Sequence, residues 1–225
     1  MIKVALIGNP NVGKSVIFNN LTGLKQHVGN WPGVTVEKKL GSFEYSNKKI
    51  EVIDLPGTYS LTSRTLDEKI ARDFIIDEKP DIVLDIVDAA NIERNLYLTL
   101  LLMEAECNLV VVLNQIDIAE KNGIEIDSKK LSHYLGVPVI PTIATEKEGM
   151  DELKELILKA ATFRNKASPL KYNNDIEDAI SIVSKAIRLD KSLGSYPLRW
   201  LSIKLLEGDA LILNSNKIFN MDVLI

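Results

Sequence analysis

The sequence has little that would support disulfides or a histidine metal site. Its 225 residues include one cysteine, Cys107, and two histidines, His27 and His133. A single cysteine forms no internal disulfide, which favours a reducing compartment, and the apolar neighbours of Cys107 predict that it fills the core. Neither histidine has cysteine or carboxylate partners at metal-ligand spacing, so both are interpreted as surface or loop residues.

Long apolar runs and an excess of positive charge are also lacking. No stretch approaches the roughly 18 apolar residues of a membrane-spanning helix, and no signal peptide precedes the first apolar run. The 27 basic and 31 acidic residues give a net charge of −4, which argues against a nucleic-acid partner. A hydrophobic content of 46% describes a globular protein. The apolar ending Met221–Ile225 predicts that the chain is part of something longer.

The strongest positive signal is a phosphate-binding loop after the apolar run Ile2–Ile7. The residues Gly8-Asn9-Pro10-Asn11-Val12-Gly13-Lys14-Ser15 fit the pattern G-x-x-x-x-G-K-[ST]. The glycines let successive N–H groups face one anion, and the helix predicted from Lys14 aims its N-terminus there. Lys14 supplies a cation for the outer phosphates, and the Ser15 hydroxyl a ligand for Mg²⁺. The alternative is a glycine-rich strand-to-helix turn without a ligand.

Two further motifs follow predicted strands. Asp54-Leu-Pro-Gly57 is D-x-x-G, in which Asp54 can reach Mg²⁺ through water and the Gly57 N–H can sense a γ-phosphate. Asn114-Gln115-Ile116-Asp117 ends the strongest strand, where ligands of open α/β sheets bind. The Asp117 carboxylate can accept two hydrogen bonds from guanine, and it rejects adenine. The alternatives are a Pro-Gly turn and an Asn/Asp loop.

Thr35 is the predicted second Mg²⁺ ligand. It lies just before a predicted edge strand, where its hydroxyl reaches the metal when the loop closes over a γ-phosphate. Taken alone, the position of Thr35 favours a β-branched strand residue over a metal ligand.

The hydrophobic pattern predicts a doubly wound α/β sheet, mostly parallel with one antiparallel edge strand. Strands are predicted at Ile2–Ile7, Val36–Tyr45, Lys49–Ile53, Ile82–Val87, Asn108–Leu113 and Val139–Thr142, and helices at 14–22, 65–78, 91–106, after Asp127 and at 150–163. Leu24–Thr35 is predicted to be a functional loop. The polar stretch Arg164–Asn174 predicts a boundary between a domain of residues 1–165 and a helical domain of residues 166–225, with helices at Asp175–Leu189 and Pro197–Leu206.

The three motifs in this order resemble the Ras-related GTPase superfamily. The run Gly29-Asn-Trp-Pro-Gly-Val-Thr-Val-Glu37, with Asp54–Ser60, is similar to the cytoplasmic N-terminal region of FeoB-type ferrous iron transporters, and the resemblance covers the whole chain. It implies GTP binding and hydrolysis, a membrane permease domain after this chain, and regulation of Fe²⁺ uptake at the cytoplasmic face of the membrane. It leaves the oligomeric state open, a homo-oligomer included.

The resemblance also assigns site residues. The nucleotide is expected at Gly8, Asn9, Pro10, Asn11, Val12, Gly13, Lys14, Ser15, Val16, Thr35, Asp54, Gly57, Asn114, Gln115, Asp117, Ile143, Ala144 and Thr145. Lys14, Asn11, Gly57 and Thr35 are the expected catalytic residues. Mg²⁺ is expected at Ser15, Thr35 and, through water, Asp54. In similar GTPases an asparagine at the Asn11 position marks hydrolysis activated by K⁺, which the side-chain carbonyl would coordinate; the alternative is that Asn11 only tolerates an unusual backbone angle.

Three residues depart from the superfamily pattern. Gln115 replaces the lysine that packs on the base, and Ile143 replaces the serine of the guanine loop. Thr58 stands where Ras-like enzymes carry the glutamine that orients water, so hydrolysis is expected to be slow or to use another group.

Two other functions share parts of this pattern. A ribosome- or RNA-associated assembly GTPase has the same phosphate loop, but the acidic charge balance argues against it. An ATP-dependent small-molecule kinase is disfavoured by Asp117 and by the single D-x-x-G.

Overall fold

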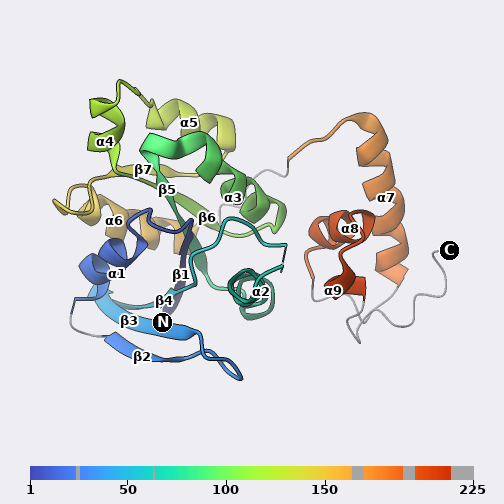
Figure 1. Cartoon of the computed structure of the whole chain (residues 1–225), viewed down its shortest axis with the longest axis horizontal. Coiled ribbons are helices and arrows are strands. Elements are labelled where there is room, and N and C mark those ends of the chain that lie inside the picture. Colours follow the sequence, from blue (N-terminus) through green and yellow to red (C-terminus); the bar gives the residue numbers. More distant parts are fainter. Residues whose placement is uncertain (24–25, 63, 164–169, 190–195, 214–225) are drawn as a thin grey trace.

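The computed structural model describes residues 1–23, 26–62, 64–163, 170–189 and 196–213, and its main feature is one seven-stranded sheet (Figure 1). The strands are β1 (Ile2–Gly8), β2 (Gln26–Asn30), β3 (Glu37–Tyr45), β4 (Lys48–Asp54), β5 (Ile82–Asp88), β6 (Leu109–Asn114) and β7 (Val139–Thr142). Their order across the sheet is β2-β3-β4-β1-β5-β6-β7. All neighbours from β4 to β7 pair in parallel, whereas β3 is antiparallel to both β4 and β2. The predicted fold class is confirmed.

The central strands are buried on both faces because they are nearly continuous apolar runs. Alternate residues of β1 belong to two separate clusters: Ala5 and Ile7 lie in one, and Val4 and Leu6 lie in the other. The first cluster packs under α2 (Leu66–Asp73), η1 (Phe74–Glu78) and α3 (Ile92–Glu104), and the second under α1 (Lys14–Thr22) and α6 (Met150–Thr162). Helices therefore cover both faces, and the carboxyl ends of the strands remain for a ligand.

Local signals set the ends of several helices. Thr65 and Glu68 form a capping box at the start of α2. Asp127 caps α5 (Ser128–Leu135) by accepting hydrogen bonds from the Lys129 and Lys130 amides. The last turn before Lys79 widens into the π-helical η1, so the helix predicted over 65–78 is two elements.

The structure corrects the predicted loop Leu24–Thr35. Residues Gln26–Asn30 form β2, which pairs with β3 from Gln26–Gly41 to Asn30–Glu37. Strand β3 therefore pairs with a neighbouring strand on each side, and β2 is the edge strand of the sheet. The sequence gives no strand signal here because β2 is largely exposed and owes its conformation to pairing rather than to an apolar face. The short helix α4 (Ile116–Lys121) was also not predicted.

In the described residues after 170, three helices form a separate group, α7 (Asn174–Leu189), α8 (Leu198–Leu206) and α9 (Ala210–Leu213) (Figure 1). Their buried residues Ile187, Trp200, Leu201 and Ile212 form one cluster with Ile76 of η1 and with Ala105. The helical group therefore packs on the sheet domain through η1 and the end of α3. Among the described residues no helix is both long and apolar enough to cross a membrane.

Candidate nucleotide site

The loop between β1 and α1 has the backbone geometry of a phosphate cradle. Asn11 has φ 68° and Gly13 has φ 88°, both in the left-handed region. A Cβ on Gly13 would lie 2.3 Å from Asn114 Nδ2, and one on Gly8 would lie 2.5 Å from the Ile86 carbonyl oxygen. Both positions therefore need glycine. Because Gly13 immediately precedes α1, the first amides of that helix are directed towards the loop.

The loop forms an open pocket of about 520 Å³. It is lined by Asn9, Pro10, Asn11, Gly13, Lys14, Ser15, Val16 and Gly57. All eight are residues that the sequence assigns to the nucleotide. Asn9 is 4% exposed, and its Oδ1 has no hydrogen-bond partner among the described residues. The pocket thus combines a cation, a hydroxyl and an unsatisfied amide oxygen at the carboxyl end of β1.

Lys14 and Asp54 form an ion pair next to this pocket. Lys14 Nζ contacts Asp54 Oδ1, and the two side chains are 13% and 7% exposed. The strand β4 carries Asp54 to this position because Leu6 of β1 pairs with it in parallel. A phosphate that binds Lys14 must take over a cation that Asp54 now neutralises.

Asn114 braces the site from the end of β6. Its Nδ2 donates to the Val12 carbonyl oxygen at 2.9 Å, and its Oδ1 accepts from Thr142 Oγ1 at 3.1 Å and from the Ala144 N–H at 3.0 Å. The side chain is 3% exposed. One amide therefore fixes the phosphate loop to the segment after β7, a bracing role that the motif alone did not reveal.

The expected guanine-recognition residues gather near this brace. Asp117 lies in the first turn of α4, 28% exposed, and pairs with Lys121 at 3.1 Å. Gln115 precedes α4 with φ 64°. Ile143 is bridged to Glu148 by backbone hydrogen bonds, and Thr145 is exposed. The structure thus brings segments 114–117 and 143–145 to the same edge of the sheet.

The Ala144 backbone is already engaged. Its N–H donates to Asn114 Oδ1, and its carbonyl oxygen accepts from Asn20 Nδ2 at 2.7 Å. A hydrogen bond from Ala144 to a base therefore has to share the donor with Asn114. Sequence reasoning missed Asn20, because one polar residue in an amphipathic helix gives no signal.

The D-x-x-G turn and the loop that carries Thr35 are placed differently. A Cβ on Gly57 would lie 3.5 Å from Pro10 Cα, so the D-x-x-G turn touches the phosphate loop. Thr58 is 3% exposed, its N–H donates to the Gly8 carbonyl, and its hydroxyl donates to the Ser60 carbonyl at 2.8 Å. Thr35 is exposed and does not line the pocket. The structure therefore brings Gly57, but not Thr35, to the phosphate loop.

Comparison with known proteins gives the family. Residues 2–157 match the family model described as ferrous iron transport protein B, and residues 172–221 match that of the FeoB cytosolic helical domain. The chain belongs to the FeoB family. Its sequence is 52% identical over 221 residues to the Fe(2+) transporter FeoB of Methanocaldococcus jannaschii and 43% identical over 212 residues to that of Escherichia coli K12. These matches cover 97% and 92% of this chain but 33% and 27% of the relatives, so the chain spans a third or less of their length.

Solved FeoB structures have the same fold. The cytosolic domain of the T. maritima FeoB iron transporter in apo form superposes with a TM-score of 0.89 at 45% identity, covering 94% of this chain and 83% of that one. The same domain in a GMPPNP form also has a TM-score of 0.89 at 45% identity, with the same coverage. The predicted family, with a G domain followed by a cytosolic helical domain, is confirmed.

Proposed function

We propose that this chain is the GTP-binding and GTP-hydrolysing switch of a ferrous iron transporter. The observation that carries the proposal is the phosphate loop with Gly57 against Pro10 and Asn114 tied to Val12, which joins the three GTPase motifs in one site. Membership of the FeoB family supports it, as do T. maritima relatives described in GDP and GMPPNP forms. The test is calorimetry: GTP and GDP bind, and ATP binds far more weakly. Equal binding of ATP and GTP would overturn the guanine assignment.

Mg²⁺ suits the oxygen donors of this site. Ser15 lines the pocket, Asp54 lies beside Lys14, and Thr35 is the hydroxyl that joins when the switch closes. Hydroxyl, carboxylate and water oxygens are the ligands that Mg²⁺ prefers. When bound, the ion neutralises charge on the outer phosphates. Lys14 and the loop amides stabilise the charge that develops on those phosphates. The Gly57 N–H senses the γ-phosphate, and this contact orders the D-x-x-G turn.

Asn11 is the proposed K⁺ ligand. It lines the phosphate pocket, and its side chain is exposed. The buried Thr58 hydroxyl is bonded to Ser60, so it does not orient water, and another group has to provide charge compensation. A monovalent cation held by the Asn11 side-chain carbonyl would supply that charge. Hydrolysis is accordingly slow and stimulated by K⁺.

Matched KCl and NaCl buffers test the potassium site. Wild-type hydrolysis is expected to be faster in KCl, and Asn11→Gly, which removes the carbonyl but accepts φ 68°, is expected to lose the difference while GDP binding remains. Asn11→Ala is the comparison, because it adds strain to the loss of the carbonyl. Equal wild-type rates in the two salts would contradict the assignment. If Asn11→Gly keeps the potassium effect, Asn11 serves only the backbone angle.

The parts of the transporter outside this chain complete the proposal. Residues 1–165 bind the nucleotide, residues 166–225 relay its state, and a membrane permease domain at the cytoplasmic face receives it. No nucleic acid takes part, and RNA binding in a salt titration would contradict this. Iron uptake by the full-length protein is expected to fail when Lys14→Ala removes the phosphate cation.

A further inference from the structure

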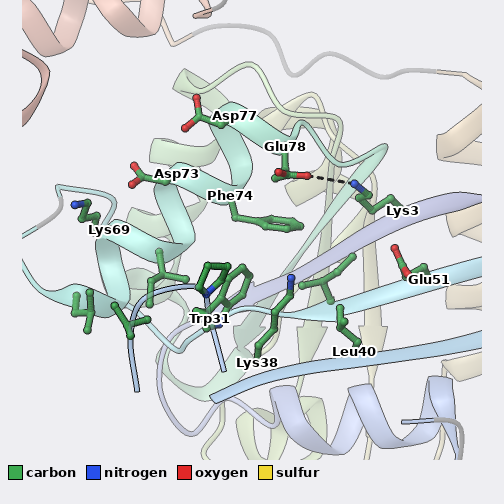
Figure 2. A pocket seen from close by; sticks show the side chains of 15 residues that line it. Lys3, Trp31, Lys38, Leu40, Glu51, Lys69, Asp73, Phe74, Asp77 and Glu78 are labelled. Carbon is green, nitrogen blue, oxygen red and sulfur yellow. Dashed lines mark hydrogen bonds and ion pairs between the residues drawn. The ribbon is translucent and has the colours of Figure 1, made fainter. Parts of the chain in front are cut away.

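Trp31 lies in a cleft away from the phosphate pocket. The cleft, of about 560 Å³, is bounded by strands β1, β3 and β4 on one side and by α2 and η1 on the other (Figure 2). Trp31 is 8% exposed although it belongs to a surface loop between β2 and β3. Neither Trp31 nor Thr35 lines the phosphate pocket. The loop that carries the expected Mg²⁺ ligand is therefore anchored elsewhere.

Two side chains hold the indole in this cleft. Phe74, the first residue of η1, meets it edge to face with ring centroids 5.5 Å apart and planes at 75°. Lys38 Nζ lies 4.6 Å from the indole centroid, on the strand that follows the loop. Figure 2 shows Trp31, Phe74 and Lys38 gathered in the cleft. The contacts join the switch loop to η1.

Trp31 and Thr35 belong to one short closed turn. The Trp31 N–H donates to the Val36 carbonyl at 2.9 Å, the Val34 N–H donates to the Trp31 carbonyl at 3.2 Å, and the pair Asn30–Glu37 closes the β2–β3 ladder. A turn of this size, fixed at both ends, moves largely as a unit. Thr35 therefore cannot move far towards Ser15 while the indole stays in place.

With Trp31 docked in the cleft, one hydrogen-bond donor is left unsatisfied. The indole Nε1 is buried and has no hydrogen-bond partner among the described residues. A buried donor without an acceptor costs free energy, which offsets part of the gain from burying the ring. Apolar contacts hold the ring in the cleft, and the unsatisfied donor weakens that hold. Such a balance suits an element with two states of similar free energy.

We propose that Trp31 is a positioning residue that controls access of Thr35 to the metal. Docked in the cleft, it keeps Thr35 away from the phosphate loop; released, it lets Thr35 reach Mg²⁺. The inference rests on the proposed GTPase function and names the regulation of that site. GTP binding then includes the cost of undocking Trp31. The apparent affinity for a GTP analogue is therefore the intrinsic affinity multiplied by the fraction of molecules in which Trp31 is undocked. GDP, which does not use Thr35, is unaffected.

Nucleotide binding to variants tests the proposal. Phe74→Leu and Trp31→Ala weaken docking, so both are expected to bind GMPPNP with Mg²⁺ roughly three- to tenfold more tightly, with GDP affinity unchanged. Val28→Ala is the matched control, since Val28 lies on the same hairpin and is 65% exposed outside the cleft. Adding Thr35→Ala to Phe74→Leu is expected to remove the gain. A general loss of structure would change both affinities.

A spectroscopic readout on the otherwise unchanged chain completes the test. The sequence has two tryptophans, Trp31 and Trp200, so 5-fluorotryptophan gives two fluorine resonances, assigned with Trp31→Phe. GMPPNP with Mg²⁺ is expected to shift the Trp31 resonance towards that of solvent-exposed indole, whereas GDP leaves it in place. Suppose that wild type binds both nucleotides, that the Trp31 resonance does not move, and that the variants keep the wild-type ratio of GMPPNP to GDP affinity. The proposed role of Trp31 is then overturned, and the proposed GTPase function stands. If wild type binds neither, the proposed function fails and this inference with it.

Discussion

At the scale of single residues, we predict that guanine selectivity depends on Asp117. Asp117→Asn is expected to weaken GTP binding by roughly 2–4 kcal/mol, because a charge-assisted pair of hydrogen bonds is lost. The same variant should gain affinity for xanthine nucleotides, whose ring offers an oxygen to the new amide. Calorimetry with GTP and xanthosine triphosphate measures both effects.

Lys121 provides the control for this prediction. It pairs with Asp117 at 3.1 Å and is 76% exposed, so Lys121→Met removes the ion pair but keeps the carboxylate. GTP binding should change little in Lys121→Met. A loss as large as that of Asp117→Asn would mean that GTP affinity depends on the ion pair rather than on the contact between Asp117 and the base.

Asp85 is a buried carboxyl that the nucleotide site does not use. It lies on β5, 1% exposed, with Oδ2 accepting from Thr99 Oγ1 at 2.5 Å and Oδ1 without a partner among the described residues. Burial raises its pKa to about 7, and the hydrogen bond from Thr99 opposes part of that rise. Below about pH 7 the folded protein therefore holds Asp85 in its protonated form.

The raised pKa predicts how stability depends on pH. Because the folded pKa lies above the unfolded value of 3.8, the contribution is complete at low pH and is lost as pH rises through about 7. Between pH 5 and pH 8 the loss is roughly 2–3 kcal/mol. Asp85→Asn removes the titration, so urea denaturation of this variant should show a correspondingly smaller fall. Parallel pH profiles for the two proteins would contradict the prediction.

At the scale of elements, the capping box of α2 anchors the segment that forms one wall of the Trp31 cleft. Thr65 Oγ1 accepts from the Glu68 N–H at 3.2 Å, and Glu68 Oε2 accepts from the Arg64 and Thr65 amides. Thr65→Ala is expected to destabilise the first turn by about 1 kcal/mol. Hydrogen exchange at the Asp67, Glu68 and Lys69 amides measures this. Thr65→Ser keeps the cap and should exchange like wild type; equally fast exchange there would show that the hydroxyl is not what holds the turn.

The elements also differ in how strongly the sequence marks them. The strands β1, β5 and β6 were predicted because two buried faces require continuous apolar runs. Edge strand β2 was not predicted, because its residues are largely exposed and need not be apolar. The six-residue α4 is too short for a helical period to show.

At the scale of the whole molecule, the helical group is a separate packing unit with a small contact on the sheet domain. Glu177 and Arg199 join α7 to α8, and this pairing holds the pKa of Glu177 at about 2, with the Tyr172 amide also contributing. Tyr172 donates to Glu104 at the end of α3. The other contacts with the sheet domain include the apolar cluster around Ile76 and Ala105 and an ion pair between Arg72 of α2 and Asp209 at 3.9 Å. None of these residues lines the phosphate pocket.

A chain ending at Lys166 is therefore expected to bind GTP with an affinity close to that of the full chain. It should be less stable, because Ile76 and Ala105 become exposed. Calorimetry, with circular dichroism as the check on folding, measures both properties. Ile76→Ser in the shortened chain is the control for aggregation through the new apolar surface. A folded, shortened chain without GTP binding would show that the helical group supplies part of the site.

The sequence by itself determined the fold class, the phosphate loop and the guanine motif, because these follow from local patterns. Gly8 and Gly13 are required by the backbone they form, and apolar runs require burial. Only the tertiary structure showed that Asn114 ties Val12 to Ala144 and that Trp31 docks on Phe74. Such contacts join residues far apart in the chain, and a side chain's partner depends on how the sheet and its helices pack. The sequence places Thr35 next to a strand; the packing of Trp31 determines where that strand's loop points.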